Sequence, residues 1–244
     1  MNIDTSQLGF SRHPVNHSSL RSREIQLWKV RSSNDAKLDA ARNLLSRDDQ
    51  IRASHIRSAH KRRQFLLGRF ALKQSLEELN EPLAEPIRVD IGANGKPLLQ
   101  DQSNPIRFNL SHADTVSVLA LAKQRELGID IEKTVARKDL LEAASMVFSD
   151  KEMAGLMTCS QQAQTNMFYR IWCHKEALIK WIGSGFSIEA SSLCLAKLMD
   201  QSGDFRRGQP TLDESVSVRL PEKLNFLELS LESNHLVVIC FDGD

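Results

Sequence analysis

Apolar and acidic residues alternate from Leu127 to Glu132, which is the period-two pattern of a β-strand. In such a strand Asp130 and Glu132 project from one face, while the intervening isoleucines face the core. A second segment, about forty residues later, has helical spacing, so Glu176 and Lys180 are four residues apart on one helix face. The two segments require a fold that combines strand with helix, because each period suits only one element.

Three carboxylates and one lysine are thereby available to a single site. Carboxylate oxygens without thiolate or imidazole partners suit a hard cation, and Mg²⁺ usually takes few protein oxygens because substrate phosphates and waters complete its coordination. The pattern suggests a metal-assisted phosphate enzyme. A plainer interpretation stays open: Glu176 and Lys180 can form an ordinary helical ion pair of about 0.2–0.5 kcal/mol. Asp130 and Glu132 can form the wet face of an antiparallel strand.

The composition is that of a globular chain with balanced charge. The 244 residues are 41% hydrophobic, enough to bury the core of one large domain or two small ones. The formal net charge of +1 gives no global attraction to nucleic acid or to an anionic membrane, so neither is an expected partner. Scattered cysteines without a CxxC spacing favour reduced thiols. A polar amino terminus and the lack of long apolar segments predict a cytoplasmic protein.

Hydrophobic periodicity predicts helices and short antiparallel strands in both halves of the chain. Ser46 is predicted to cap helical structure that carries an apolar face and ends at Pro82 and Pro86. Further helices are predicted near residues 140–147, 150–159 and 165–182. Strands are predicted near residues 25–30, 87–91, 106–109, 117–122, 128–132, 215–220, 224–232 and 236–241. A loop is predicted at residues 203–210.

Five motifs stand in order along the chain. They are Gly95-Lys96-Pro97, Phe108-Asn109-Leu110-Ser111-His112, Gly128-Ile129-Asp130-Ile131-Glu132-Lys133, Phe148-Ser149-Asp150-Lys151-Glu152 and Trp172-Cys173-His174-Lys175-Glu176-Ala177-Leu178-Ile179-Lys180. As an ordered set they resemble the 4′-phosphopantetheinyl transferases of the monomeric surfactin-synthetase type, from about residue 46 to residue 186. Two positions depart from that family: Ala113 stands where a second serine is common, and Cys173-His174 are unusual fillers.

The resemblance implies an α+β fold of two similar halves related by a pseudo-twofold axis. Each half would pack helices on a small antiparallel sheet, with the active site at the interface of the halves. Residues 1–125 would form the amino-terminal half, which makes the adenine and phosphate contacts to coenzyme A. Residues 126–244 would form the carboxyl-terminal half, with the metal site and the catalytic helix. A monomer is expected.

The reaction that the resemblance implies is attack by a serine hydroxyl of an apo acyl or peptidyl carrier protein on the β-phosphate of coenzyme A, which leaves 3′,5′-ADP. Charge develops on the phosphate oxygens, so positioning and cationic stabilisation are the main catalytic needs. Asp130, Glu132 and Glu176 would hold Mg²⁺, with Lys180 beside the same phosphates. Glu176 is the first candidate for the general base, Glu152 the second and a metal-bound water the third.

Further residues are expected at coenzyme A from the same resemblance. They are Lys96 and Pro97 at the adenine, Ser111 and His112 at the phosphates, Arg52 and Arg63 at the 3′-phosphate, and Lys180. A serine hydrolase built on Ser111 and His112 is disfavoured, because adjacent residues of a strand point to opposite faces. The chain also has no Gly-x-Ser-x-Gly elbow.

Two other classes of function remain open. A Mg²⁺-dependent nuclease or phosphatase would use the same carboxylates. A noncatalytic nucleic-acid module would use the basic stretch 61–63. Within the transferase class, acceptance of carriers from more than one pathway is expected, as for other large single-chain members. Residues 183–186 follow the catalytic helix and are either a helix stop or an apolar surface for carrier docking, with Phe186 at its centre.

Overall fold

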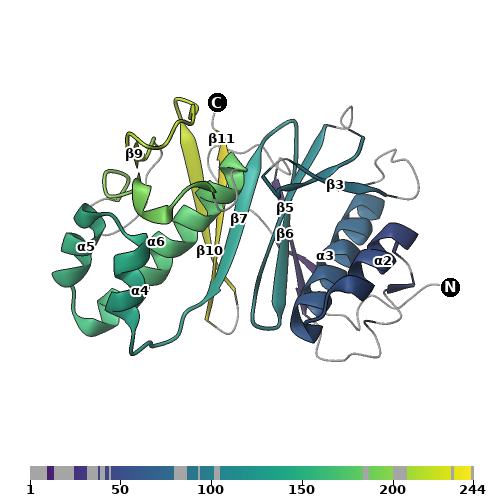
Figure 1. The fold of residues 1–244 in the computed structure, drawn as a ribbon, viewed down its shortest axis with the longest axis horizontal. Helices are drawn as coiled ribbons and strands as arrows, with labels where there is room; N and C mark the ends of the chain where they lie inside the picture. Colours follow the sequence, from purple (N-terminus) through teal and green to yellow (C-terminus); the bar gives the residue numbers. More distant parts are fainter. Residues whose placement is uncertain are drawn as a thin grey trace. The chain divides into compact units, whose positions relative to one another are not determined.

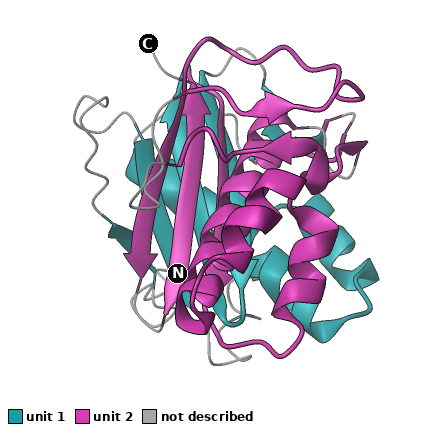
Figure 2. Cartoon of the chain, turned by 90° about the vertical axis from the view of Figure 1, so that its left-hand side faces the viewer, with its two compact units in different colours: residues 1–91, 97–124 teal, residues 92–96, 125–244 magenta. Residues whose placement is uncertain are grey.

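The computed structural model describes residues 10–13, 25–31, 38, 42–43, 45–79, 87–92, 94–101, 105–183, 187–199, 208–231 and 234–242. The chain divides into two compact units, one of residues 1–91 and 97–124 and the other of residues 92–96 and 125–244 (Figure 2). Each unit combines helices with small antiparallel sheets, so the predicted mixed class is confirmed. The pseudo-twofold relation between the halves stays a prediction.

The first unit is built on a four-stranded antiparallel sheet with the order β1-β2-β6-β5. Its strands are β1 (Ser11–His13), β2 (Ile25–Arg31), β5 (Ile106–Ala113) and β6 (Val116–Lys123). Helix α3 (Ala59–Glu78) packs against β2 and β6, with α2 (Arg47–His55) beside it (Figure 1). Strands β3 (Val89–Ile91) and β4 (Pro97–Leu99) form a separate two-stranded sheet.

The helices of this unit begin and pack largely as the sequence predicts. Ser46 caps α2, and its hydroxyl accepts a hydrogen bond from the Asp49 backbone N–H at 3.2 Å. A second cap at Ser58 separates α2 from α3, a break that periodicity did not predict. Leu72 and Leu76, on the predicted apolar face of α3, are at most 1% exposed. The helix ends at Glu78, and the prolines predicted to end it lie outside the described residues.

The second unit is built on a three-stranded antiparallel sheet with the order β10-β11-β7. Its strands are β7 (Leu127–Lys133), β10 (Leu224–Leu231) and β11 (His235–Asp242). Helix α6 (Gln161–Ile182) packs along β7 and β11, as Figure 1 shows. The remaining elements are α4 (Leu140–Val147), α5 (Asp150–Met157), the short 3₁₀ helix η3 (Ala190–Ser192) and the paired strands β8 (Leu193–Cys194) and β9 (Thr211–Leu212).

The predicted strand at residues 215–220 is wrong. Within the described chain this stretch lies in no sheet, because a turn at its start redirects the backbone: Asp213 Oδ1 accepts from the Ser215 N–H at 2.9 Å. Val216 and Leu220 still pack against the core, so the alternation reflects burial without strand pairing. Of the loop predicted at 203–210, residues 203–207 lie outside the described residues.

The state of the cysteines and the apolar character of the helices bear on two expectations from composition. All four cysteines lie among them as free thiols: Cys159, Cys173, Cys194 and Cys240. No helix in the described ranges has both the length and the apolar character needed to cross a bilayer.

Candidate functional site

Helix α6 lies directly on β7 because Gly128 has no side chain. A Cβ atom at this position would lie 2.1 Å from the Ala177 carbonyl oxygen and 2.3 Å from the Trp181 backbone nitrogen, both in α6. Asp130 and Glu132 follow at two-residue intervals on the same face of the strand. The acidic face is therefore the one that the helix covers, and the interpretation of a wet strand face is wrong.

Three side chains of α6 meet that acidic face, at four-residue intervals along one stripe of the helix. Lys180 Nζ lies 2.6 Å from Asp130 Oδ1, in an ion pair whose lysine is 28% exposed and whose aspartate is 5% exposed. Trp172 Nε1 donates a hydrogen bond to Glu132 Oε1 at 2.7 Å. Glu176 stands between these two helix positions. The strand and the helix thus bring three carboxylates and one ammonium group together.

The carboxylates of the cluster are partly buried and repel one another, and both effects raise their pKa values. Burial, followed by repulsion from Asp130, raises the pKa of Glu132 to about 7, although Trp172 and Lys180 act in the opposite direction. Burial and then Asp130 also raise the pKa of Glu176, and Lys180 again opposes them. Such mutual repulsion in a partly desolvated place disfavours full ionisation unless a cation is present.

A magnesium ion would require of this cluster both oxygen ligands and a suitable arrangement of them. Its donors are all carboxylate oxygens, the type that Mg²⁺ prefers, and their crowding is of the kind that a cation relieves. Yet no group of three or more His, Cys, Asp or Glu side chains in the described ranges is arranged to hold a metal ion. Asp130, one of the expected ligands, forms an ion pair with Lys180. The residue types fit Mg²⁺, and the side chains need to rearrange to bind it.

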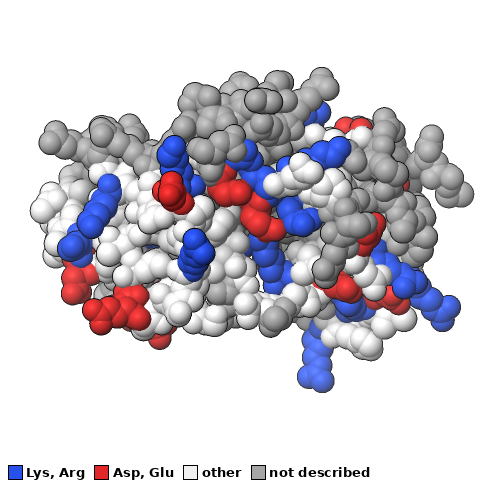
Figure 3. Space-filling view, turned by 90° about the horizontal axis from the view of Figure 1, so that it is seen from above, with Lys and Arg blue, Asp and Glu red and all other residues white. Residues whose placement is uncertain are grey.

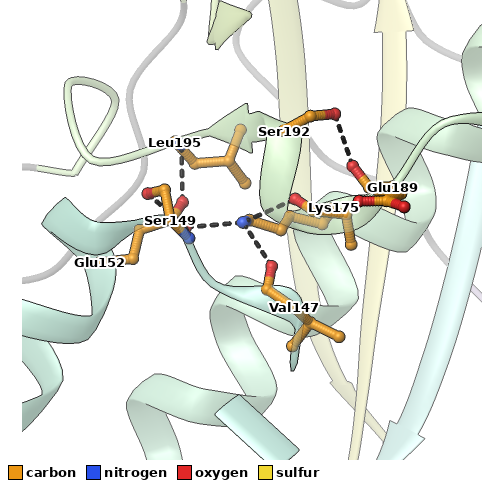
Figure 4. A network of polar contacts seen from close by, with 8 residues as sticks. Val147, Ser149, Glu152, Lys175, Glu189, Ser192 and Leu195 are labelled. Carbon is orange, nitrogen blue, oxygen red and sulfur yellow. Dashed lines mark hydrogen bonds and ion pairs between the residues drawn. The ribbon is translucent and has the colours of Figure 1, made fainter. Parts of the chain in front are cut away.

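Glu152 lies in a different network, which Figure 4 shows. Its carboxylate is completely buried and pairs with Lys175 Nζ at 2.6 Å. The same oxygen, Oε2, accepts from the Ser149 backbone N–H at 2.8 Å and from its hydroxyl at 2.9 Å. The other oxygen, Oε1, accepts from the Leu195 N–H at 2.7 Å. Glu152 thus caps α5 and binds α6, and its predicted role as a base stays a prediction.

Lys96 stabilises the end of α6. Its Nζ donates to Glu126 Oε2 at 3.0 Å, to the Leu127 carbonyl at 3.2 Å and to the Trp181 carbonyl at 3.2 Å. The last of these carbonyls lies in the final turn of the helix, where such groups lack helical partners. Pro97, the next residue, begins β4. Contact of this turn with adenine stays a prediction.

The other residues expected at coenzyme A all lie in the first unit. Ser111 and His112 are on β5, where Ser111 is buried and His112 exposed. This opposite orientation agrees with the argument against a serine–histidine hydrolase. Arg52, on α2, donates to the Val89 carbonyl at 3.2 Å, and Arg63 is half-buried on α3. Their contacts with coenzyme A stay predictions.

The basic stretch 61–63 forms part of the start of α3. Arg62 donates to the carbonyl of Ile56 at 3.2 Å. On the face drawn in Figure 3, lysine and arginine side chains are interspersed with aspartate and glutamate side chains. The residues coloured in that view thus form no continuous basic surface on that face, and the nucleic-acid module at residues 61–63 stays an untested alternative. The docking surface predicted around Phe186 lies outside the described residues.

Sequence reasoning missed Lys175. This lysine is 0% exposed, although lysine is almost never fully buried without a partner. The signal was present in the helical spacing, since residues 168, 171, 175 and 178 form one stripe whose other members are Phe, Ile and Leu. A lysine inside such a stripe calls for a buried acceptor. The sequence does not show which of its carboxylates that acceptor is.

Comparisons with known proteins show the family of the chain. Residues 126–225 match the family model of the 4′-phosphopantetheinyl transferase superfamily. The chain is 33% identical over 168 residues to the 4′-phosphopantetheinyl transferase Sfp of Bacillus subtilis, a match that covers 69% of this chain and 66% of that protein. It is 29% identical over 172 residues to the 4′-phosphopantetheinyl transferase HetI of Nostoc sp., covering 69% and 73%. The chain belongs to the 4′-phosphopantetheinyl transferases, a family of enzymes.

Proposed function

We propose that this enzyme transfers the 4′-phosphopantetheine arm of coenzyme A to a serine of an apo carrier protein, in a Mg²⁺-dependent reaction that releases 3′,5′-ADP. The observation that carries the proposal is the approach of Lys180 and Glu176 on α6 to Asp130 and Glu132 on β7, in a chain of this family. The named relatives support the class of reaction, since each is called a phosphopantetheinyl transferase.

The carboxylates have distinct proposed roles. Asp130, Glu132 and Glu176 would hold Mg²⁺, which supplies Lewis acidity and a template for the pyrophosphate. Trp172 holds Glu132 in its orientation through the 2.7 Å hydrogen bond. Glu176 is proposed to accept the proton of the carrier serine, since it stands between Trp172 and Lys180 on the helix stripe that meets the acidic face of β7. Lys180, partly exposed, is a point charge that can stabilise the negative leaving phosphate.

The coenzyme A contacts are proposed from both halves of the chain. Arg52 and Arg63 would bind the 3′-phosphate, Ser111 and His112 the other phosphates, and the turn at Lys96 and Pro97 the adenine. We place the active site at the interface of two pseudo-twofold-related halves, residues 1–125 and 126–244. A cytoplasmic monomer is the state in which we expect the enzyme to act.

One assay tests the proposal against its alternatives. The protein is incubated with Mg²⁺, coenzyme A and apo carrier proteins of several types, and the carriers are weighed by mass spectrometry. We expect a mass gain of one phosphopantetheine arm with equimolar 3′,5′-ADP, stopped by EDTA and restored by added Mg²⁺. Unchanged carriers of every type would refute the transferase. Released phosphate or cleaved strands would instead indicate a metal-dependent phosphatase or nuclease, and salt-sensitive retention of nucleic acid without turnover a binding module.

A further inference from the structure

Lys175 carries a charge into the interior of the second unit. Its side chain is 0% exposed, and Nζ has three acceptors: Glu152 Oε2 at 2.6 Å, the Val147 carbonyl at 2.8 Å and the Ala190 carbonyl at 2.9 Å. An ammonium group has three protons, so this set of acceptors satisfies it completely. Figure 4 shows this nitrogen with dashed lines to its acceptors, which belong to three separate segments of the chain.

Glu152 is satisfied as fully as its partner. Besides Lys175, it accepts from the Ser149 N–H and hydroxyl on one oxygen and from the Leu195 N–H on the other. The network therefore joins α6 to the end of α4, the start of α5, η3 and the residue after β8. With both oxygens bonded and the side chain 0% exposed, the carboxylate is poorly suited to receive a proton from a substrate.

Lys175 is held in one direction by its hydrogen bonds. This also fixes how α6 is rotated about its axis, and so where the helix face that contacts β7 points. Successive residues of an α-helix are rotated by about 100°, so holding one side chain sets the orientation of the next. Glu176 is that next residue, and Lys180 lies on the same stripe as Glu176. Apolar side chains pack without directional bonds and tolerate small rotations, whereas three hydrogen bonds at 2.6–2.9 Å do not.

Stability alone does not explain why this pair is ionic. Apolar residues of similar volume in place of a buried ion pair often give equal or greater stability, since two charges lose their hydration on burial. We propose that Glu152 and Lys175 are positioning residues, which set the rotation of α6 about its axis and so direct Glu176 and Lys180 toward Asp130. The catalytic part of this inference rests on the proposed function, because it takes the carboxylate cluster as the reaction site.

Two variants and a control separate positioning from stability. Glu152→Gln keeps the shape but leaves Lys175 charged without its counter-ion, while Glu152→Gln with Lys175→Met removes both charges. Glu228→Gln is the control. Glu228, on β10, forms an ion pair with Arg170 of α6 at 2.8 Å, but this pair is partly exposed to solvent and so contributes little. Three quantities are measured where each protein is folded: Tm, the kcat of transfer, and hydrogen exchange of the Trp172 indole N–H.

The indole N–H reports how α6 sits on β7, since it donates to Glu132 at 2.7 Å and its exchange requires neither metal nor substrate. Its signal is assigned by its loss in Trp172→Phe. We expect Glu152→Gln to lower Tm and the double variant to recover most of it. In both, kcat should fall roughly 100-fold, as for a reacting group misplaced by about 1 Å, and the indole should exchange faster, while KM for coenzyme A stays nearly constant. The control should leave all three quantities unchanged.

Two results would overturn the inference. A double variant with native kcat and native indole exchange would show that the pair contributes only stability. Loss of kcat in Glu152→Gln with unchanged Tm and unchanged indole exchange would make Glu152 a catalytic residue. A wild-type protein that modifies no carrier would refute the proposed function instead, and the indole exchange of the variants would still test the pair.

Discussion

At the scale of single residues, the ion pair between Asp130 and Lys180 determines what metal binding requires. The carboxylate is buried and the ammonium lies 2.6 Å from Oδ1, so a cation that binds Asp130 shares this carboxylate with Lys180. The crowding that raises the pKa of Glu132 and Glu176 acts in the opposite sense, because it favours cation entry.

Removal of one ligand should be rescued by metal, whereas removal of the base should not. Asp130→Ala should lower turnover, with partial recovery at high Mg²⁺, because the site is weakened but the base remains. Glu176→Gln should bind coenzyme A yet turn over roughly 10²–10⁴-fold more slowly even at saturating Mg²⁺. Steady-state kinetics across Mg²⁺ concentrations measure both. Recovery of Glu176→Gln with metal would exclude Glu176 as the base, and the assignment would move to Glu152 only if Glu152→Gln failed to recover while its Tm and its indole exchange stayed native.

His174 makes stability depend on pH. Burial lowers its pKa to about 3, against the hydrogen bond to the Arg170 carbonyl, which raises it. Between that value and the unfolded value of about 6.5, the unfolded chain binds a proton that the folded chain does not. The contribution of His174 to stability should therefore fall by about 1.4 kcal/mol per pH unit as the pH drops below 6.5, while Glu132, with its pKa raised to about 7, contributes in the opposite sense over much of this range. The test is the difference between the two proteins: from pH 7.5 to pH 5, urea unfolding should show His174→Leu becoming more stable relative to wild type. An unchanged difference between the two proteins would contradict the assignment.

At the scale of elements, α6 depends on contacts at its side and at its end. Gly128 lets the helix approach β7. Lys96 Nζ donates a hydrogen bond to the Trp181 carbonyl in the final turn. Its Cδ lies 3.1 Å from the position that a Cβ on Gly183 would take. Gly183 itself has φ +74°, a left-handed conformation that glycine adopts without strain and that ends the helix.

A methyl group at Gly128 should disrupt the contact between helix and strand. Gly128→Ala should cost about 3 kcal/mol or more of unfolding free energy, since the new atom meets the backbone and not a flexible side chain. Gly155→Ala is the matched control: its Cβ would meet only the Met167 Cε at 3.2 Å, and alanine favours the helix by about 0.5–1 kcal/mol. Urea unfolding measures both. Equal stabilities of the two variants would contradict the close approach.

Lys96 offers a test between a structural contact and a coenzyme contact. Lys96→Met should lower the unfolding free energy by about 1–3 kcal/mol, because two buried or half-buried carbonyls lose a charged donor. Lys151→Met, at an exposed position of α5, should have almost no effect. If Lys96→Met instead keeps its stability and raises KM for coenzyme A, the lysine acts on the ligand.

At the scale of the whole molecule, each unit has an apolar core of its own, and the formal net charge is +1. The charge gives no long-range attraction to a carrier of either sign, so recognition depends on local contacts. We predict measurable transfer to apo carriers from more than one pathway, measured as kcat/KM across a panel. Turnover with a single carrier alone would contradict this.

The sequence predicted the long elements and the composition of the carboxylate cluster. Residues 127–133 and the second half of α6 repeat their periods often enough to identify both elements, and the four-residue spacing placed Glu176 and Lys180 together. Strands β1, β4, β8 and β9 have two or three residues each, too few for a period to appear. Residues 215–220 alternate without pairing, because alternation records burial and not hydrogen bonds.

The sequence by itself determined which side chains share a strand face or a helix face, because those relations follow from local backbone geometry. Only the tertiary structure decided which face meets which. In the folded chain α6 packs on the acidic face of β7 at Gly128, and Lys175 pairs with Glu152, 23 positions away in the sequence. Lys96 donates a hydrogen bond to the last turn of α6. Such contacts depend on how separate elements pack, and no local period encodes the distance between them.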